Sequence, residues 1–99
     1  MNGTQKLEIL QESFLDSSEF DLLLNKLFDV LISQYRARLK RYERDLNDFE
    51  ARYGLDSAQF YQQFENGELG DATDFFEWAS LYELHKAVQD KIQRLEAAV

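Results

Sequence analysis

The feature that most constrains the fold is a regular stripe of apolar side chains in the first half of the chain. Its members follow one another at spacings of four and three without a slip: Phe28, Ile32, Tyr35, Leu39, Tyr42, Leu46, Phe49 and Tyr53. Such a seven-residue repeat places apolar side chains along one face of an α-helix. Because the chain has no proline and only four glycines, few positions force a helix to stop. The pattern predicts a long helix over residues 18–53 and an all-α fold.

Residues with helix-capping character lie at both limits of this predicted helix. Asp16, Ser17 and Ser18 offer side-chain acceptors to the free amides of a helix start. Gly54 follows Tyr53 and can adopt the left-handed conformation that ends a helix.

Two more helices are predicted after Gly54. A short one over residues 57–66 follows Asp56, with Gln59 completing a capping box, and ends at Asn66 and Gly67. A C-terminal helix over residues 74–98 follows Asp74, with Glu77 as a cap partner, and has its own apolar stripe. That second stripe contains Trp78, Leu81, His85, Val88, Ile92, Leu95 and Val99.

The N-terminal segment, residues 1–16, is poorly determined by its pattern. Leu7 and Ile9 alternate like a short strand, whereas Leu7, Leu10 and Phe14 share one helical face. We interpret it as a short helix.

The length of the first long helix predicts association. At about 1.5 Å per residue it would extend for about 54 Å, whereas a compact domain of about 100 residues has a radius of gyration of about 13 Å. A single copy therefore cannot shelter the whole stripe, and we expect a homodimer or larger assembly with the stripe as its seam in a helical hairpin or bundle. Just before the stripe, apolar residues surround most of the helix, so that part should be buried on several sides: Leu22, Leu23, Leu24, Leu27, Val30 and Leu31.

Residues that could carry catalysis are few. Without cysteine and with His85 as the only histidine, the common zinc sites and thiol nucleophiles are excluded. We interpret His85 as a buried or half-buried residue that fixes helix register. Glu65 and Glu68 could form one acidic pair of a magnesium-dependent nucleotide pyrophosphohydrolase, but no separate Glu-x-x-Asp pair follows on a facing helix. We predict no enzyme activity, metal or cofactor, with a divergent hydrolase as an alternative.

The charge distribution indicates the kind of partner. The net charge is −8, and residues 55–99 carry nine acidic against three basic side chains. This half should repel nucleic acid and attract basic surfaces. With no cysteine, no signal-like start and no apolar run long enough for a bilayer, the expected location is the cytoplasm, without membrane contact.

A basic strip leaves nucleic-acid binding open as an alternative. Arg36, Lys40 and Arg44 share one helical face at a spacing of four and could follow phosphates. Acidic residues follow at once, however, so a face of ion pairs is the favoured interpretation.

Acidic and aromatic residues alternate in the second half and form the predicted partner-binding set. Three aromatic residues on one helix turn point in different directions, so at least one must leave the core and could anchor a partner. The set contains Glu65, Glu68, Asp71, Asp74, Phe75, Phe76, Glu77 and Trp78.

The stretch from Glu43 to Tyr82 also resembles a protein family. The residues that carry the resemblance are Phe49-Glu50, Arg52-Tyr53-Gly54, Phe60, Phe64, Gly67-Glu68-Leu69-Gly70-Asp71, Asp74-Phe75-Phe76-Glu77-Trp78 and Leu81-Tyr82. They are similar to small helical antitoxin-like proteins of bacterial and archaeal toxin-antitoxin modules. The resemblance implies binding and silencing of a small, basic, RNA-cleaving protein. A DNA-binding arm of the kind found in typical antitoxins is not evident in this sequence, so autoregulation is not implied.

Overall fold

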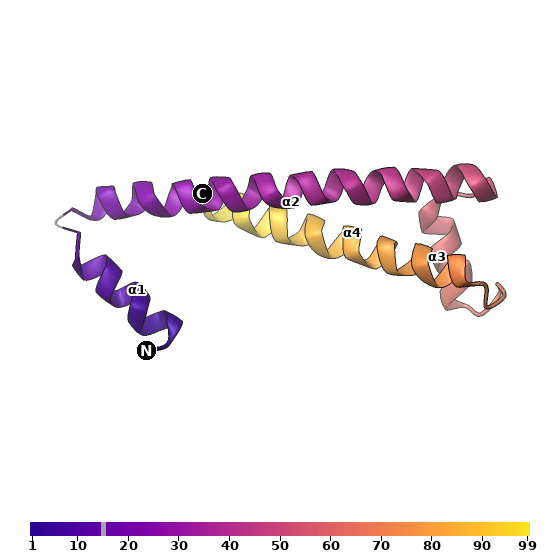
Figure 1. Ribbon diagram of the computed structural model, residues 1–99, viewed down its shortest axis with the longest axis horizontal. Helices are drawn as coiled ribbons and strands as arrows, with labels where there is room; N and C mark the ends of the chain where they lie inside the picture. Colours follow the sequence, from indigo (N-terminus) through magenta and orange to yellow (C-terminus); the bar gives the residue numbers. More distant parts are fainter. Residues whose placement is uncertain (15) are drawn as a thin grey trace.

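The chain folds into helices arranged around one long hairpin, as seen in a computed structural model that describes residues 1–14 and 16–99 (Figure 1). The helices are α1 (Gly3–Glu12), α2 (Ser17–Tyr53), α3 (Ser57–Glu65) and α4 (Thr73–Ala98). The described residues contain no strand. The prediction of an all-α fold with a helical hairpin is therefore confirmed.

Polar side chains cap the two N-terminal helices. The Asn2 side chain accepts a hydrogen bond from the backbone of Gln5, and the Gln5 side chain accepts one from the backbone of Asn2. This reciprocal capping box fixes α1 as a helix, the interpretation preferred over a strand. Asp16 caps α2 by accepting from the backbone N–H of Ser18. Leu15 lies outside the described residues.

α2 ends and α3 begins at residues that the sequence singled out. Gly54 has a φ of 63°, and its backbone N–H donates to the Glu50 carbonyl. Asp56 then caps α3 by accepting from the backbone of Gln59 at 3.0 Å. Glu50 adds a bond from its own helix, since its carboxylate accepts from the backbone N–H of Ser57 at 2.8 Å. The connection between α2 and α3 is thus held by hydrogen bonds on both sides.

The start of α4 differs from the prediction. α4 begins at Thr73 after Ala72, and no side chain caps it. The prediction that Asp74 caps this helix is wrong, because the Asp74 carboxylate instead accepts hydrogen bonds from α2.

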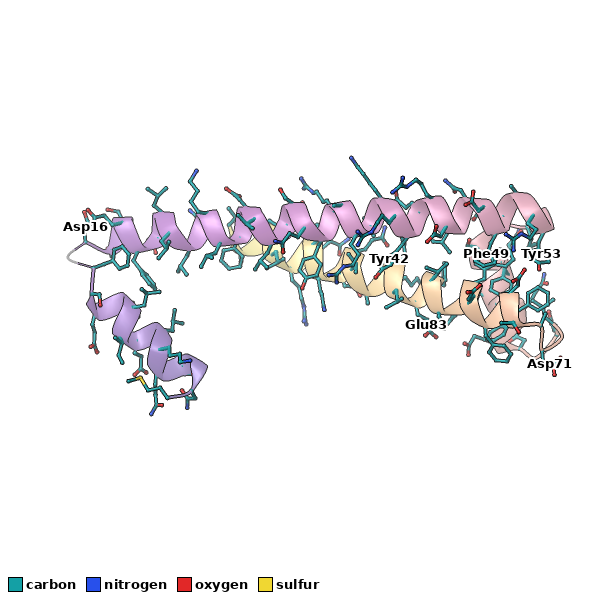
Figure 2. All side chains as sticks on the ribbon, viewed as in Figure 1. Asp16, Tyr42, Phe49, Tyr53, Asp71 and Glu83 are labelled. Atoms are coloured by element: carbon teal, nitrogen blue, oxygen red, sulfur yellow. The ribbon has the colours of Figure 1, made fainter. Side chains whose placement is uncertain are left out.

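α2 and α4 run antiparallel and pack along their apolar stripes (Figure 1). Ile32, Leu46 and Phe49 of α2 are buried, as are Val88 and Ile92 of α4. In Figure 2, Tyr42 and Phe49 lie between the two helices. The α4 helix of the same chain therefore covers the middle of the predicted seam.

The core is concentrated where the hairpin closes. Trp78 and Phe60 are fully buried, and their rings stack with centroids 3.7 Å apart. Phe49 stacks on Trp78 from α2 at 5.6 Å. The indole N–H of Trp78 donates to the Ser57 hydroxyl at 2.9 Å, so the buried polar atom is satisfied. Three helices meet at this aromatic stack.

α4 is shorter than α2 and leaves the start of α2 without cover. Val99, at the end of α4, lies beside Asp29 and Ile32. The preceding part of α2 projects beyond the hairpin, and α1 folds back from it at an angle (Figure 1). The chain measures 60 × 25 × 18 Å, with a radius of gyration of 19.6 Å. That radius exceeds the roughly 13 Å of a compact domain of this size.

No helix in the described part of the chain is long and apolar enough to cross a membrane.

Candidate functional site

Two surfaces are candidates for binding, and they lie at opposite ends of the hairpin. The first is the N-terminal arm, which we define as α1 together with residues 17–31 of α2. The second is the closed end, defined as residues 45–84, which includes α3 and the loop before α4.

The N-terminal arm exposes apolar side chains that the rest of the described chain leaves uncovered. Seven have exposed fractions of 39% to 60%: Leu7, Ile9, Leu10, Leu22, Leu27, Val30 and Leu31. α1 has no buried residue. An aromatic contact lies where the two parts of the arm meet: Phe14, which follows α1, packs edge to face against Phe20 of α2, with ring centroids 5.6 Å apart. The expectation that this part of α2 is buried on several sides is not met within one copy.

The predicted partner-binding residues fall into separate places in the structure. The prediction that Trp78 contacts a partner is wrong, because its side chain is fully buried in the aromatic stack. Phe75 is half-buried against the same core. Glu65, Glu68 and Asp71 are exposed around the loop before α4, and Asp71 is labelled at the hairpin tip in Figure 2.

Asp74 belongs to an internal network. Its carboxylate accepts from the Tyr53 hydroxyl at 2.6 Å and from the Arg52 guanidinium at 2.8 Å. These hydrogen bonds, the one from Tyr53 first, lower the pKa of Asp74 from its ordinary value of 3.8. The same contact raises the pKa of Tyr53 and that of Arg52. Asp74 therefore links α4 to α2, and its carboxylate is engaged within the chain rather than free for a partner.

Phe76 and Glu77 lie on an open groove between α2 and α4. The groove has a volume of about 700 Å³. Apolar side chains from both helices form part of its wall, namely Phe49, Phe76, Leu81 and Leu84. Phe76 is 54% exposed and Leu84 is 47% exposed, so the groove presents apolar surface to solvent. This exposed Phe76 matches the expectation that one aromatic residue leaves the core.

Acidic side chains border the same groove. Asp45 and Asp48 come from α2, and Glu77 comes from α4. None of them forms an ion pair within the described residues. Arg52 also lines the groove, but Asp74 neutralises it.

Sequence reasoning missed Asp45, Asp48 and Leu84 as site residues. Each lies one position before a residue of the apolar stripe of its helix, so it is next to the seam and not part of it. These flanking residues could have been found by assuming that the two stripes pair antiparallel.

The predicted dimer seam is partly occupied by the chain itself. Ile32, Leu46 and Phe49 are buried, whereas Phe28, Tyr35, Leu39 and Tyr42 are half-buried, and Tyr53 is exposed. Lys91 of α4 lies over the Tyr35 ring at 5.5 Å. The apolar surface that a single copy leaves uncovered is therefore on the N-terminal arm more than on the seam.

The basic strip is exposed along α2. Arg36 forms an ion pair with Glu96 of α4, so one of its three members is engaged. Lys40 and Arg44 border a shallow depression together with Glu43. The ion pair of Arg36 leaves less positive charge for phosphates, and the interpretation of the strip as a face of ion pairs stays a prediction.

His85 is half-buried between the long helices. Its Nε2 lies 3.3 Å from a carboxylate oxygen of Glu43 on α2. The half-burial of His85 agrees with the prediction from the sequence, and its role in fixing helix register stays a prediction. No group of three histidine or acidic side chains suited to a metal ion occurs in the described residues.

Tyr61 and Glu83 link α3 to α4 on the side where α3 packs. The Tyr61 hydroxyl donates to Glu83 at 2.5 Å, and this bond raises the pKa of Tyr61. The Tyr61 ring also packs against the Tyr82 ring, with centroids 4.7 Å apart, so these side chains hold α3 against α4.

Comparisons of the chain with known protein families, with curated proteins and with solved structures found no match.

Proposed function

We propose that this protein is a non-enzymatic helical binding module, and that its first partner is a second copy of itself, docked through the N-terminal arm. The observation that carries the proposal is the uncovered apolar surface of α1 and residues 17–31. Large exposed apolar surfaces are rare on monomers and mark association surfaces.

The arm's own geometry favours a second copy as its cover. Apolar residues lie around most of the circumference of this part of α2, and α1 is itself apolar along one face. A helix with such a circumference needs neighbours on several sides. Two arms related by a twofold axis would bring four helical segments together, the smallest arrangement that gives each segment several neighbours.

The energy available is of the right size for association. Burying a Leu or Ile side chain fully contributes about 1.5 to 3 kcal/mol, and the seven arm residues are each roughly half-exposed. Burial of these side chains in both copies is therefore of the same order as the cost of association, about 4 to 15 kcal/mol.

The partner beyond the second copy follows the family resemblance. We assign the module an antitoxin-like role in the cytoplasm of a prokaryotic cell, in which it neutralises or regulates a small, basic, RNA-cleaving protein. The excess of acidic side chains in the second half supports a basic partner, and the absence of cysteine fits a reducing compartment.

Sedimentation velocity over a dilution series tests self-association. The wild type should sediment as a dimer that dissociates on dilution. The double variant Leu27→Gln with Leu31→Gln should weaken association by at least about a hundredfold, because four buried leucines are lost per dimer. Leu84→Gln is the matched control: Leu84 is similarly exposed but lies at the closed end, so its dimer should be unchanged.

A wild-type monomer at every concentration would end the self-association proposal. The antitoxin-like role is tested separately by co-expression with the product of the neighbouring open reading frame. Copurification and relief of growth arrest are expected, and a harmless product that does not copurify would refute the role.

A further inference from the structure

The groove between α2 and α4 at the closed end is lined by both apolar and acidic side chains, and this chemistry selects an occupant. We infer that it docks a basic, amphipathic helix of another protein. This deepens the proposed function by naming the segment of the partner that the module recognises, and it rests on that function.

The charge of the closed end is the first argument. Between residues 45 and 84 the chain carries ten acidic side chains and a single basic one, Arg52, for a formal charge of −9. The rest of the chain has nine acidic and ten basic side chains, a charge of +1. The whole net charge of −8 thus originates at one end of the hairpin. Such a field attracts basic segments and repels nucleic acid and acidic segments.

The shape and polarity of the groove are the second argument. Its walls are two antiparallel helices that contribute exposed Phe76 and Leu84. They also contribute Asp45, Asp48 and Glu77, which form no ion pair with any described residue. An apolar wall with an acidic border accepts an occupant that is apolar on one side and basic along its edges. An amphipathic helix with lysine or arginine beside its apolar stripe meets both requirements.

The length of the groove sets the length of the occupant. On α4 the lining residues run from Thr73 to Leu84, and on α2 from Asp45 to Arg52. At about 1.5 Å per residue the longer wall spans about 16 Å, which corresponds to about three turns of a docked helix.

A second copy of the chain is a poorer occupant. α1 is the short helix that has no buried residue, but in its range Gly3–Glu12 it carries Glu8 and Glu12 against Lys6. It is therefore net acidic and would be repelled by the closed end.

Fluorescence anisotropy with a labelled peptide tests the inference on the full chain. The probe is a helical peptide of about four turns made of leucine and lysine, with leucine at spacings of three and four. The controls are the same peptide with glutamate in place of lysine and a lysine peptide with scrambled leucine positions. Binding of the first alone is expected, weakening as salt rises.

Variants locate the site of binding. Asp45→Asn with Asp48→Asn should weaken the peptide about tenfold, and Phe76→Gln with Leu84→Gln by at least as much. Glu68→Gln with Asp71→Asn removes the same charge at the hairpin tip and should change affinity by less than about threefold. Circular dichroism of each variant checks that the helices are retained; these side chains are exposed or border the groove, so folding should persist.

Three results would overturn the inference. The groove and tip variants could weaken the peptide equally, which would mean attraction to charge without a site. The scrambled peptide could bind as tightly as the amphipathic one. Finally, Phe76→Gln with Leu84→Gln could dissociate the dimer, which would make a second copy the occupant. The monomeric arm variant Leu27→Gln with Leu31→Gln should keep full peptide affinity, so failure of self-association and failure of the groove give different results.

Discussion

The two ends of this hairpin use the same kinds of residue to opposite effect. At the closed end, aromatic side chains from three helices stack until Trp78 and Phe60 have no exposed surface. In the N-terminal arm, leucines such as Leu22 and Leu27 remain exposed because only two helical segments meet there, beside the contact of Phe14 with Phe20. Apolar composition alone therefore does not make a core. A core requires enough neighbouring helices to surround each side chain.

The largest expected contrast between the two ends is in the free energy of unfolding. Trp78→Ala should lower it by about 3 to 5 kcal/mol, since it removes a fully buried ring from the stack. Leu27→Ala in the arm should change it by less than about 0.5 kcal/mol when the protein is dilute enough to be monomeric. Urea unfolding followed by circular dichroism measures both, and similar losses from the two variants would contradict the contrast.

A smaller effect is expected from the polar contact inside the aromatic stack. Ser57→Ala leaves the indole N–H of Trp78 without its acceptor in a buried place, which should cost about 1 to 3 kcal/mol. Ser80→Ala is the control, because Ser80 is exposed on the groove. If both serines can be replaced at no cost in the same unfolding experiment, the indole contact contributes nothing to the core.

The turn that brings α3 onto the hairpin should contribute less. Gly54 has a φ of 63° with open space around it, so Gly54→Ala meets no clash but strains the backbone by about 1 kcal/mol. Gly70→Ala, at a glycine without a positive φ, provides the comparison and should be neutral. A thermal melt of both variants measures the difference, and an equal shift would show that the left-handed conformation is not the cause.

The smallest effect is a dependence of stability on pH at the closed end. The pKa of Asp74 is lowered in the folded state, so its contribution to stability is present above the unfolded pKa and is lost as pH falls through the folded one. Asp74→Asn should therefore destabilise the protein at neutral pH, and the difference from wild type should shrink below about pH 4. Urea midpoints measured from acid to neutral pH test this. A difference that stays constant over that range would exclude the carboxylate as the titrating group.

Local patterns predicted most of the helix limits, because they depend on neighbours in sequence. Asp16 and Asp56 cap the starts of α2 and α3 with their side chains, and Gly54 ends α2 in the left-handed conformation. The apolar stripes of α2 and α4 predicted which faces of these helices contain the buried side chains. Their pairing with each other could not be read from either stripe alone, since each fits a second copy as well as its partner in the chain.

The candidate sites were harder to predict because they depend on which helices become neighbours. Trp78 and Phe76 are two positions apart on one helix, yet one is fully buried and the other is half-exposed. Asp74 is a residue type that commonly caps helices, but its carboxylate accepts hydrogen bonds from Arg52 and Tyr53 on α2 instead. Asp45 and Asp48 gained a place in the groove only when α4 lay beside them.

The most direct test of the account is hydrogen-deuterium exchange measured at two protein concentrations. If a second copy covers the N-terminal arm, amides of α1 (Gly3–Glu12) and of residues 17–31 should exchange more slowly at the higher concentration, while those around the aromatic stack should be equally protected at both. Exchange of α1 that stays fast at every concentration would contradict the claim that the arm exists to associate.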